Sequence, residues 1–165
     1  MTIHFDHSLS SALSRIEFTK HHELIVHEPE ILRSLHNTDD IMEKYTELKW
    51  RIIDLLNETY NTSFCLSHWL ESKEDEVSYF LNEAGSNVLS YSQFKAPYKF
   101  HLWIGKKGFI IGIEQKGQGF DAEKVHSQRL KENEGAAFDF FRNCLSQVFF
   151  DDKNNSRIVF MEHLV

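Results

Sequence analysis

Proline and glycine are scarce in this chain, whose 165 residues include only two prolines and seven glycines. With no low-complexity segment and no fixed repeat, this argues against long flexible linkers and repeat architectures. The chain also lacks a run of ~18 apolar residues, the length that a membrane-spanning helix requires. Residues 1–10 carry acids and histidines in place of the apolar stretch of a secretion signal. We therefore expect a cytoplasmic protein that does not enter a membrane and forms one compact unit.

Concentrated positive charge is also missing. The net charge is −7 at pH 7, and Lys106 and Lys107 are the only adjacent basic pair. Binding to a nucleic-acid backbone depends on clustered Lys and Arg side chains. We therefore expect no nucleic-acid partner.

Cysteine is equally sparse, whereas histidine is abundant. Cys65 and Cys144 have no CxxC neighbour, which excludes the usual zinc and redox motifs and favours buried free thiols. Among the ten histidines, His21 and His22 are adjacent and so point in different directions, and no HExxH or i,i+4 pair occurs. The sequence therefore predicts surface or half-buried histidines and no metal site built from them.

The first 60 residues have a mainly helical pattern. We predict a short helix over residues 8–18 and a second that begins at Pro29 and ends near Leu35. The longest helix should cover residues 41–57, where apolar positions recur at helical spacing. We expect residues 1–70 to form an N-terminal helical segment that packs on the rest of the domain or forms a dimer surface; residues 61–70 are compatible with a short strand or an irregular connection.

The second half, residues 71–165, alternates between helical and strand patterns. The predicted order is a helix that starts after Ser72 and reaches Tyr91, a hairpin of 98–104 with 109–114, a polar loop or partly helical flap over 120–133, a helix over 135–145 and a hairpin of 148–150 with 158–161. The first hairpin is predicted from the alternation of apolar residues over 98–104 and from the Gly-Lys-Lys-Gly turn that follows. This order favours the α+β class, as a two-layer sandwich of one sheet covered by helices.

Polar residues and glycines at three places in this half suggest a nucleotide site. Glu83 and Asn87 lie one helical turn apart, at the edge of the apolar stripe of their helix. A glycine-rich turn then follows a strand, and a glycine opens a helix whose free N–H groups can bind phosphate. The candidate site residues are Glu83, Asn87, Gln115, Gly117, Gly119, Arg129 and Gly135.

In this order the three segments resemble the motifs of the GHKL ATP-binding superfamily, which includes ATPase domains of DNA gyrase, sensor histidine kinases and mismatch-repair proteins. Residues 82–87 are similar to its N box, residues 113–121 to its first glycine box and residues 134–138 to its second. The resemblance runs from about Glu76 to the C-terminus and is nearest to the anti-sigma-factor serine kinases of bacterial partner switching. It implies a Bergerat-type fold, whose sheet is mixed and mainly antiparallel.

The resemblance also implies ligands and roles for the candidate residues. ATP and Mg²⁺ would be the cofactors, with Asn87 holding the metal and Glu83 acting as the catalytic group that orients or deprotonates the attacking atom. The nucleotide itself would be contacted by Gln115, Gly117, Gly119 and Gly135, and by Arg129 of the loop that precedes the last helix.

Two positions depart from the family pattern. Gln115 stands where the family has an aspartate that accepts a hydrogen bond from the adenine amino group. Its amide oxygen can still accept, but it is neutral and one methylene longer, so the contact is weaker or displaced. Ala137 stands where the second glycine box has another glycine, which restricts the backbone of the phosphate loop.

Three functional hypotheses follow. In the first, the protein is an ATP- and Mg²⁺-binding homodimer that acts on a regulatory protein partner as an anti-sigma-type kinase or a sequestering factor. In the second, the fold is an interaction module with a degenerate nucleotide site. In the third, a histidine in an N-terminal helical pair, among His21, His22, His27 and His36, accepts a phosphoryl group.

Overall fold

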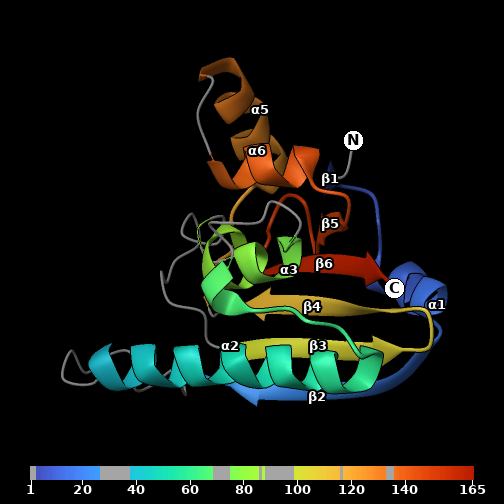
Figure 1. Ribbon diagram of the computed structural model, residues 1–165. Helices are drawn as coiled ribbons and strands as arrows, with labels where there is room; N and C mark the ends of the chain where they lie inside the picture. The colour runs from blue at the N-terminus through green and yellow to red at the C-terminus, as the bar shows by residue number, and fades with distance from the viewer. Residues whose placement is uncertain are drawn as a thin grey trace.

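Six strands form one mixed sheet in the computed structural model, which describes residues 3–26, 38–68, 75–85, 87, 99–115, 117–132 and 136–165. The strand order is β1-β5-β6-β4-β3-β2. The strands are β1 (Ile3–His4), β2 (Phe18–Ile25), β3 (Lys99–Gly105), β4 (Gly108–Glu114), β5 (Gln147–Phe150) and β6 (Ile158–Leu164). The pair β1 and β5 is parallel and the other four pairs are antiparallel. The predicted α+β class is confirmed (Figure 1).

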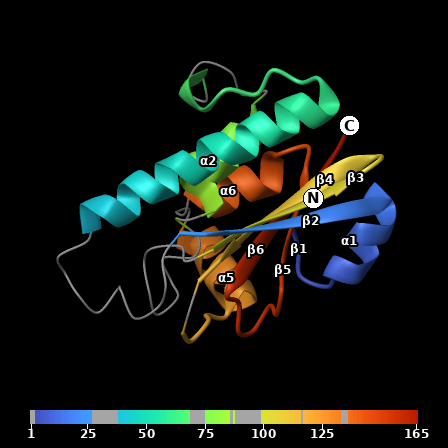
Figure 2. The ribbon, with the colours of Figure 1, turned by 90° about the horizontal axis from the view of Figure 1, so that it is seen from below.

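Helices lie on both faces of this sheet. They are α1 (Leu9–Ile16), α2 (Thr38–Tyr60), the 3-10 turn η3 (Leu66–His68), α3 (Glu76–Tyr79), the π-helical turn η4 (Phe80–Ala84), α5 (Ala122–Glu132) and α6 (Ala136–Asn143). Figure 2 shows α2 and α1 on opposite sides of the strands. We call the side that α2 covers the helix face and the side that α1 covers the second face.

The helix face holds the larger core. The predicted alternation in β3 is present, because Phe100 and Leu102 both belong to this core, together with Ile111 of β4. The apolar positions of α2 that cover them include Ile52 and Leu56, both fully buried. The helical spacing in residues 41–57 thus predicted both the helix and the side that it buries.

The second face carries a smaller core under α1. Ala12 and Ile16 pack there with Trp103, Ile110, Phe149 and Phe160. Ser8 caps the start of α1, where its side chain accepts a hydrogen bond from the Ser11 N–H at 3.2 Å. Because both faces are covered here, the residues of β3 from Phe100 to Gly105 are all buried.

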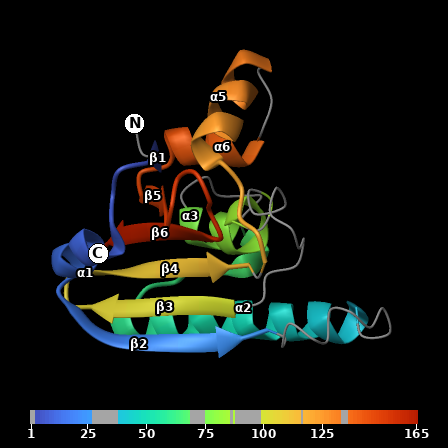
Figure 3. The ribbon, with the colours of Figure 1, turned by 180° about the vertical axis from the view of Figure 1, so that it is seen from behind.

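The helical prediction for the N-terminal part is wrong at residues 18–25, which form β2 at the edge of the sheet beside β3 (Figure 3). Residues 3–4 form the other edge, parallel to β5. Most of β2 is exposed, so its side chains show no alternation of buried and exposed positions, and backbone pairing with β3 decides its structure. The helix predicted from Pro29 to Leu35 lies outside the described residues. The first 25 residues thus supply both edges of the sheet.

The remaining elements follow the predicted order. The hairpins β3–β4 and β5–β6 are confirmed, and the predicted loop or flap contains the helix α5, which projects from the body in Figures 1 and 3. Within the described part of the chain, no helix is long and apolar enough to cross a membrane.

Candidate functional site

The helix that carries Glu83 and Asn87 contains a π-helical turn. Asp75 caps its start, since its carboxylate accepts a hydrogen bond from the Ser78 N–H at 2.9 Å. The turn over Phe80–Ala84 ends with the N–H of Gly85 donating to the carbonyl of Phe80. Single π turns inside α-helices are rare and occur frequently at functional sites. Glu83 lies in this turn and is half-buried, and Asn87 follows it and is exposed.

Gly85 brings this helix directly against the end of β4. A β-carbon on Gly85 would clash with Cδ1 of Ile113 and would lie 3.1 Å from the carbonyl oxygen of Phe80. The helix therefore packs on β4 two residues before Gln115. The structure thus brings together two of the three segments that the sequence singled out.

Gln115 is the most unusual residue at this junction. Its side chain is 1% exposed, and neither Oε1 nor Nε2 has a hydrogen-bond partner among the described residues. Its backbone N–H donates to the carbonyl of Arg157 at 2.8 Å, which fixes Gln115 beside the start of β6. Leaving a buried polar group unpaired costs about 1–3 kcal/mol, so such groups need an explanation.

The glycines after Gln115 have different roles. Gly117 has φ 90°, a backbone angle that favours glycine, and it is exposed. Gly119 packs against the protein itself, because a β-carbon there would lie 2.6 Å from the carbonyl oxygen of Ser156. Its N–H donates to Oδ1 of Asn155 at 3.1 Å. Gly119 was expected to contact the nucleotide, but its close contact in the structure is with the turn between β5 and β6.

The segment that was expected to be a polar loop or flap forms the helix α5, part of which packs on the body of the protein. His126 is 6% exposed, and its ring packs at a tilt against Phe5 and Phe138, at centroid distances of 5.4 and 5.5 Å. Burial lowers the pKa of His126, and the neighbouring Arg142 lowers it further. Arg129 is partly exposed and forms an ion pair with Glu132 of the same helix at 3.6 Å.

The second glycine box is described only in part. Gly135 lies outside the described residues, and α6 begins at Ala136. Ala137 is buried and belongs to the helix-face core. Its side chain therefore has a packing role inside the protein.

Aromatic contacts join α6 to the helix that carries Glu83. The rings of Tyr79 and Phe140 lie 4.6 Å apart, and those of Phe80 and Phe141 lie 6.2 Å apart. Burial raises the pKa of the Tyr79 hydroxyl, and the carboxylates of Glu83 and Asp139 raise it further. Sequence reasoning missed Tyr79 as a neighbour of both carboxylates, although it precedes Glu83 by one helical turn.

Asn82, the first residue of the predicted N box, faces away from this group. Its side-chain Oδ1 accepts a hydrogen bond from Nζ of Lys49 at 3.1 Å, and its Nδ2 donates to the carbonyl of Leu66 at 3.0 Å. Asn82 therefore fastens the helix to α2 and η3, and Asn87 is the amide of this motif that stays accessible.

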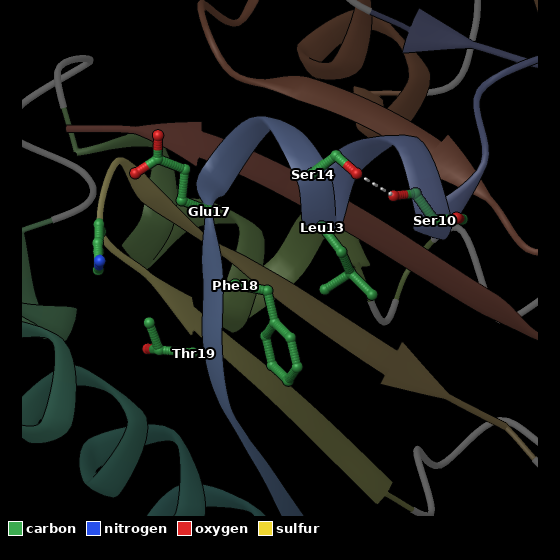
Figure 4. Close-up of a pocket in the computed structure, with 7 residues that line it drawn as sticks. Ser10, Leu13, Ser14, Glu17, Phe18 and Thr19 are labelled. Atoms are coloured by element: carbon green, nitrogen blue, oxygen red, sulfur yellow. Dashed lines mark hydrogen bonds between the residues drawn. The ribbon is translucent and has the colours of Figure 1, made fainter.

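An open hollow of about 710 Å³ lies elsewhere, between α1 and the start of β2 (Figure 4). Leu13, Glu17 and Phe18 are among the residues that line it, and Ser14 donates to the carbonyl of Ser10 at its rim at 3.3 Å. None of the predicted site residues lines this hollow. Its polar groups belong to exposed side chains at a surface that is open to water.

A buried serine beside a histidine has a structural role. Ser146 Oγ donates to Glu76 Oε2 at 2.7 Å and lies 2.9 Å from Nδ1 of His163. The serine stands between the acid and the histidine, whereas a catalytic triad needs the histidine between the acid and the nucleophile. Glu76 also accepts from the backbone N–H groups of Leu145 and Ser146, so its carboxylate caps this loop.

The fold and the site together define an α+β protein in which a π-containing helix packs on the end of a central strand, two residues before a buried amide that has no partner among the described residues. No protein-family model, no curated protein and no solved structure matches this chain.

Proposed function

We propose that this protein binds ATP at the junction of the η4 helix, the end of β4 and the following glycine turn. The observation that carries this proposal is the side-chain amide of Gln115, buried and without a partner among the described residues. It lies two residues after Ile113, on which the helix of Glu83 and Asn87 packs. A ligand that pairs with the amide would offset the cost of burying it.

Adenine has the hydrogen-bonding groups that this amide requires. Oε1 of Gln115 can accept from the exocyclic amino group, and Nε2 can donate to a ring nitrogen. An ionised aspartate, as in the GHKL pattern, can accept hydrogen bonds but cannot donate one. The glutamine would therefore hold adenine through two neutral hydrogen bonds in place of one charge-assisted bond.

Asn87 and Glu83 would serve the phosphate end of the nucleotide. Asn87 is an exposed residue, and its side-chain amide carries a hard oxygen of the kind that Mg²⁺ takes beside phosphate oxygens and water. Bound Mg²⁺ would neutralise phosphate charge. The Glu83 carboxylate would orient or deprotonate an attacking hydroxyl.

The wider assignment rests on the order of the motifs and elements. The proposed class is a GHKL protein with a Bergerat-type two-layer sandwich, to which α1 adds a cover on the second face. Its nearest likeness, to anti-sigma-factor kinases, suggests a cytoplasmic homodimer that phosphorylates or sequesters a regulatory protein.

A second candidate function is an interaction module with a degenerate nucleotide site. Gly119 packs on the turn between β5 and β6, Ala137 packs in the core, and His126 is buried. These three residues are used for packing, which leaves fewer groups for phosphate. The phosphotransfer hypothesis expected its acceptor histidine on a helix, whereas His21 and His22 lie in strand β2. Residues 27–37 lie outside the described residues.

Thermal unfolding with and without Mg²⁺ and ATP tests the proposal. Ligand at a hundred times its dissociation constant adds about 2.7 kcal/mol of stability. We expect ATP to raise Tm more than GTP, Gln115→Asp to strengthen binding, and Asn87→Ala to remove its Mg²⁺ dependence. Gln118→Asp, at an exposed position of the same loop, is the matched control. A Tm that does not change at millimolar ATP would contradict the proposal and would favour the interaction module.

A further inference from the structure

Two histidines and a glutamate gather on the second face of the sheet, away from the nucleotide site. Nε2 of His21 lies 3.0 Å from Nδ1 of His101, and Oε1 of Glu23 lies 3.8 Å from the same Nδ1. One ligand atom from each of these three residues lies within 4.8 Å of the other two. Three donor atoms this close can reach one ion, since metal–ligand distances are about 2.0–2.2 Å.

The pairing of β2 with β3 creates this cluster. Glu23 is directly opposite His101, and His21 is opposite Trp103. His21 and Glu23 are two residues apart on one strand, so their side chains share a face. The three donors therefore project from paired backbone, which holds their spacing more firmly than a loop would.

Neighbouring side chains restrict both imidazole rings. The Trp103 indole stacks on His21 at a centroid distance of 4.6 Å and on His101 at 5.0 Å, with interplanar angles of 9° in both cases. The other ring nitrogen of His101, Nε2, lies 2.8 Å from Oε2 of Glu114. A carboxylate on the far nitrogen of a histidine is a recurrent feature of metal sites, where it fixes the tautomer and raises the basicity of the ligating nitrogen.

The charges around Glu23 leave one of its oxygens for an ion. Its Oε2 pairs with Nζ of Lys99 at 3.7 Å, while Oε1 is the atom that faces His101. His101 is buried, whereas His21 and Glu23 are exposed. The cluster thus has an anchored inner ligand and two outer ligands that solvent and ions can reach.

We propose that His21, Glu23 and His101 bind one divalent transition-metal ion of the Zn²⁺ type. Two imidazoles and one carboxylate suit Zn²⁺, Cu²⁺ and Ni²⁺, and they disfavour Mg²⁺ and Ca²⁺, which take oxygen ligands. Three protein ligands at an accessible surface leave a coordination position for water or an exogenous group. The site is separate from the proposed nucleotide site and does not depend on it.

Calorimetric titration of the tag-free, chelator-treated protein with Zn²⁺, in the absence of nucleotide, tests this proposal. We expect one tight site per chain. His21→Ala should weaken it at least about tenfold, and Glu114→Gln, which removes no ligand, should weaken it about 10–100-fold. His22→Ala is the matched control, because His22 is on the same strand, opposite Leu102, and its side chain is on the helix face.

The outcomes are distinguishable. Equal Zn²⁺ affinity of the wild type and His21→Ala, or an equal loss in His22→Ala, would overturn the proposal. Cu²⁺ provides a second readout, since a paramagnetic ion at the cluster should quench the fluorescence of Trp103. Quenching that persists undiminished in Trp103→Phe would place the ion elsewhere and would count against the site. Circular dichroism of each variant checks that the substitution leaves the fold intact.

Discussion

The end of the Ile113 side chain fills the space where a side chain at Gly85 would begin. This contact fixes how closely the helix of Glu83 approaches β4. We expect Gly85→Ala to lower the stability by about 1–3 kcal/mol through overpacking, although alanine favours a helix more than glycine does. Urea denaturation measures the change.

Ile113→Val removes the Cδ1 atom that the new β-carbon would meet. The double variant should therefore lose less stability than the two single variants added together, by a coupling of about 0.5–3 kcal/mol. Strict additivity would show that the two positions do not touch.

Replacing Gln115 with an apolar residue should raise the stability of the ligand-free protein and abolish its binding of ATP. Gln115→Met keeps the length of the side chain and removes the two unpaired polar atoms. We expect the ligand-free protein to gain about 1–3 kcal/mol and the ATP-induced rise in Tm to disappear. A Met variant that is less stable than the wild type would mean that the amide has a partner in the folded protein.

The ion pair of Arg15 and Glu162 joins α1 to β6. Nε of Arg15 donates to both oxygens of Glu162, at 2.6 and 2.9 Å, and the Glu162 side chain is 1% exposed. Arg15→Met should cost about 3 kcal/mol, because it leaves a buried carboxylate without its counter-charge.

The exposed pair of Lys107 and Glu17, at 3.0 Å, is the control for this variant. Lys107→Met should change the free energy of unfolding by less than about 1 kcal/mol. Similar losses in the two variants would show that the burial of Glu162 adds nothing to the strength of its pair.

His126 should make the protein less stable in mild acid. Burial lowers its pKa below the ordinary value of 6.5, so the unfolded chain binds a proton more readily than the folded one. Its neutral form is fully compatible with folding above about pH 6.5, and stability falls as the pH drops below that value.

Urea unfolding between about pH 7.5 and 5.5 measures this effect. His126→Leu should reduce the slope of stability against pH, and Gln128→Leu, at an exposed position of the same helix, should leave it unchanged. An unaltered slope in His126→Leu would assign the acid sensitivity to other histidines, such as the half-buried His163, whose pKa is lowered by burial.

The sequence predicted those elements whose own residues determine them. Alternation and a Gly-Lys-Lys-Gly turn predicted the β3–β4 hairpin, and the spacing of apolar residues predicted α2. The strand β2 was missed because its exposed side chains carry no alternation, and its partner β3 is remote in the chain. A π turn is similarly hidden, since it changes the hydrogen bonding of a helix without changing its composition.

In the candidate sites, too, the sequence identified residues by their local pattern but did not show their burial or their remote neighbours. Gln115 stood out in the sequence, but only the structure reveals that its amide is buried and lacks a partner among the described residues. Gly119 seemed suited to a ligand, and the structure gives it a packing role instead. The cluster of His21 and His101 was invisible because the two residues are 80 positions apart and share no local motif.

Gly112 lies opposite His101 in the β-ladder, under the edge of the Trp103 indole. A β-carbon there would stand 3.0 Å from Cζ3 of Trp103 and 3.4 Å from Cβ of His101. Any larger residue would raise the indole and tilt the imidazoles stacked on it. The missing side chain at position 112 thus allows the Trp103 indole and the two imidazoles to form one flat aromatic surface across β2 and β3. A substitution at this position would deform that surface without changing any residue of it.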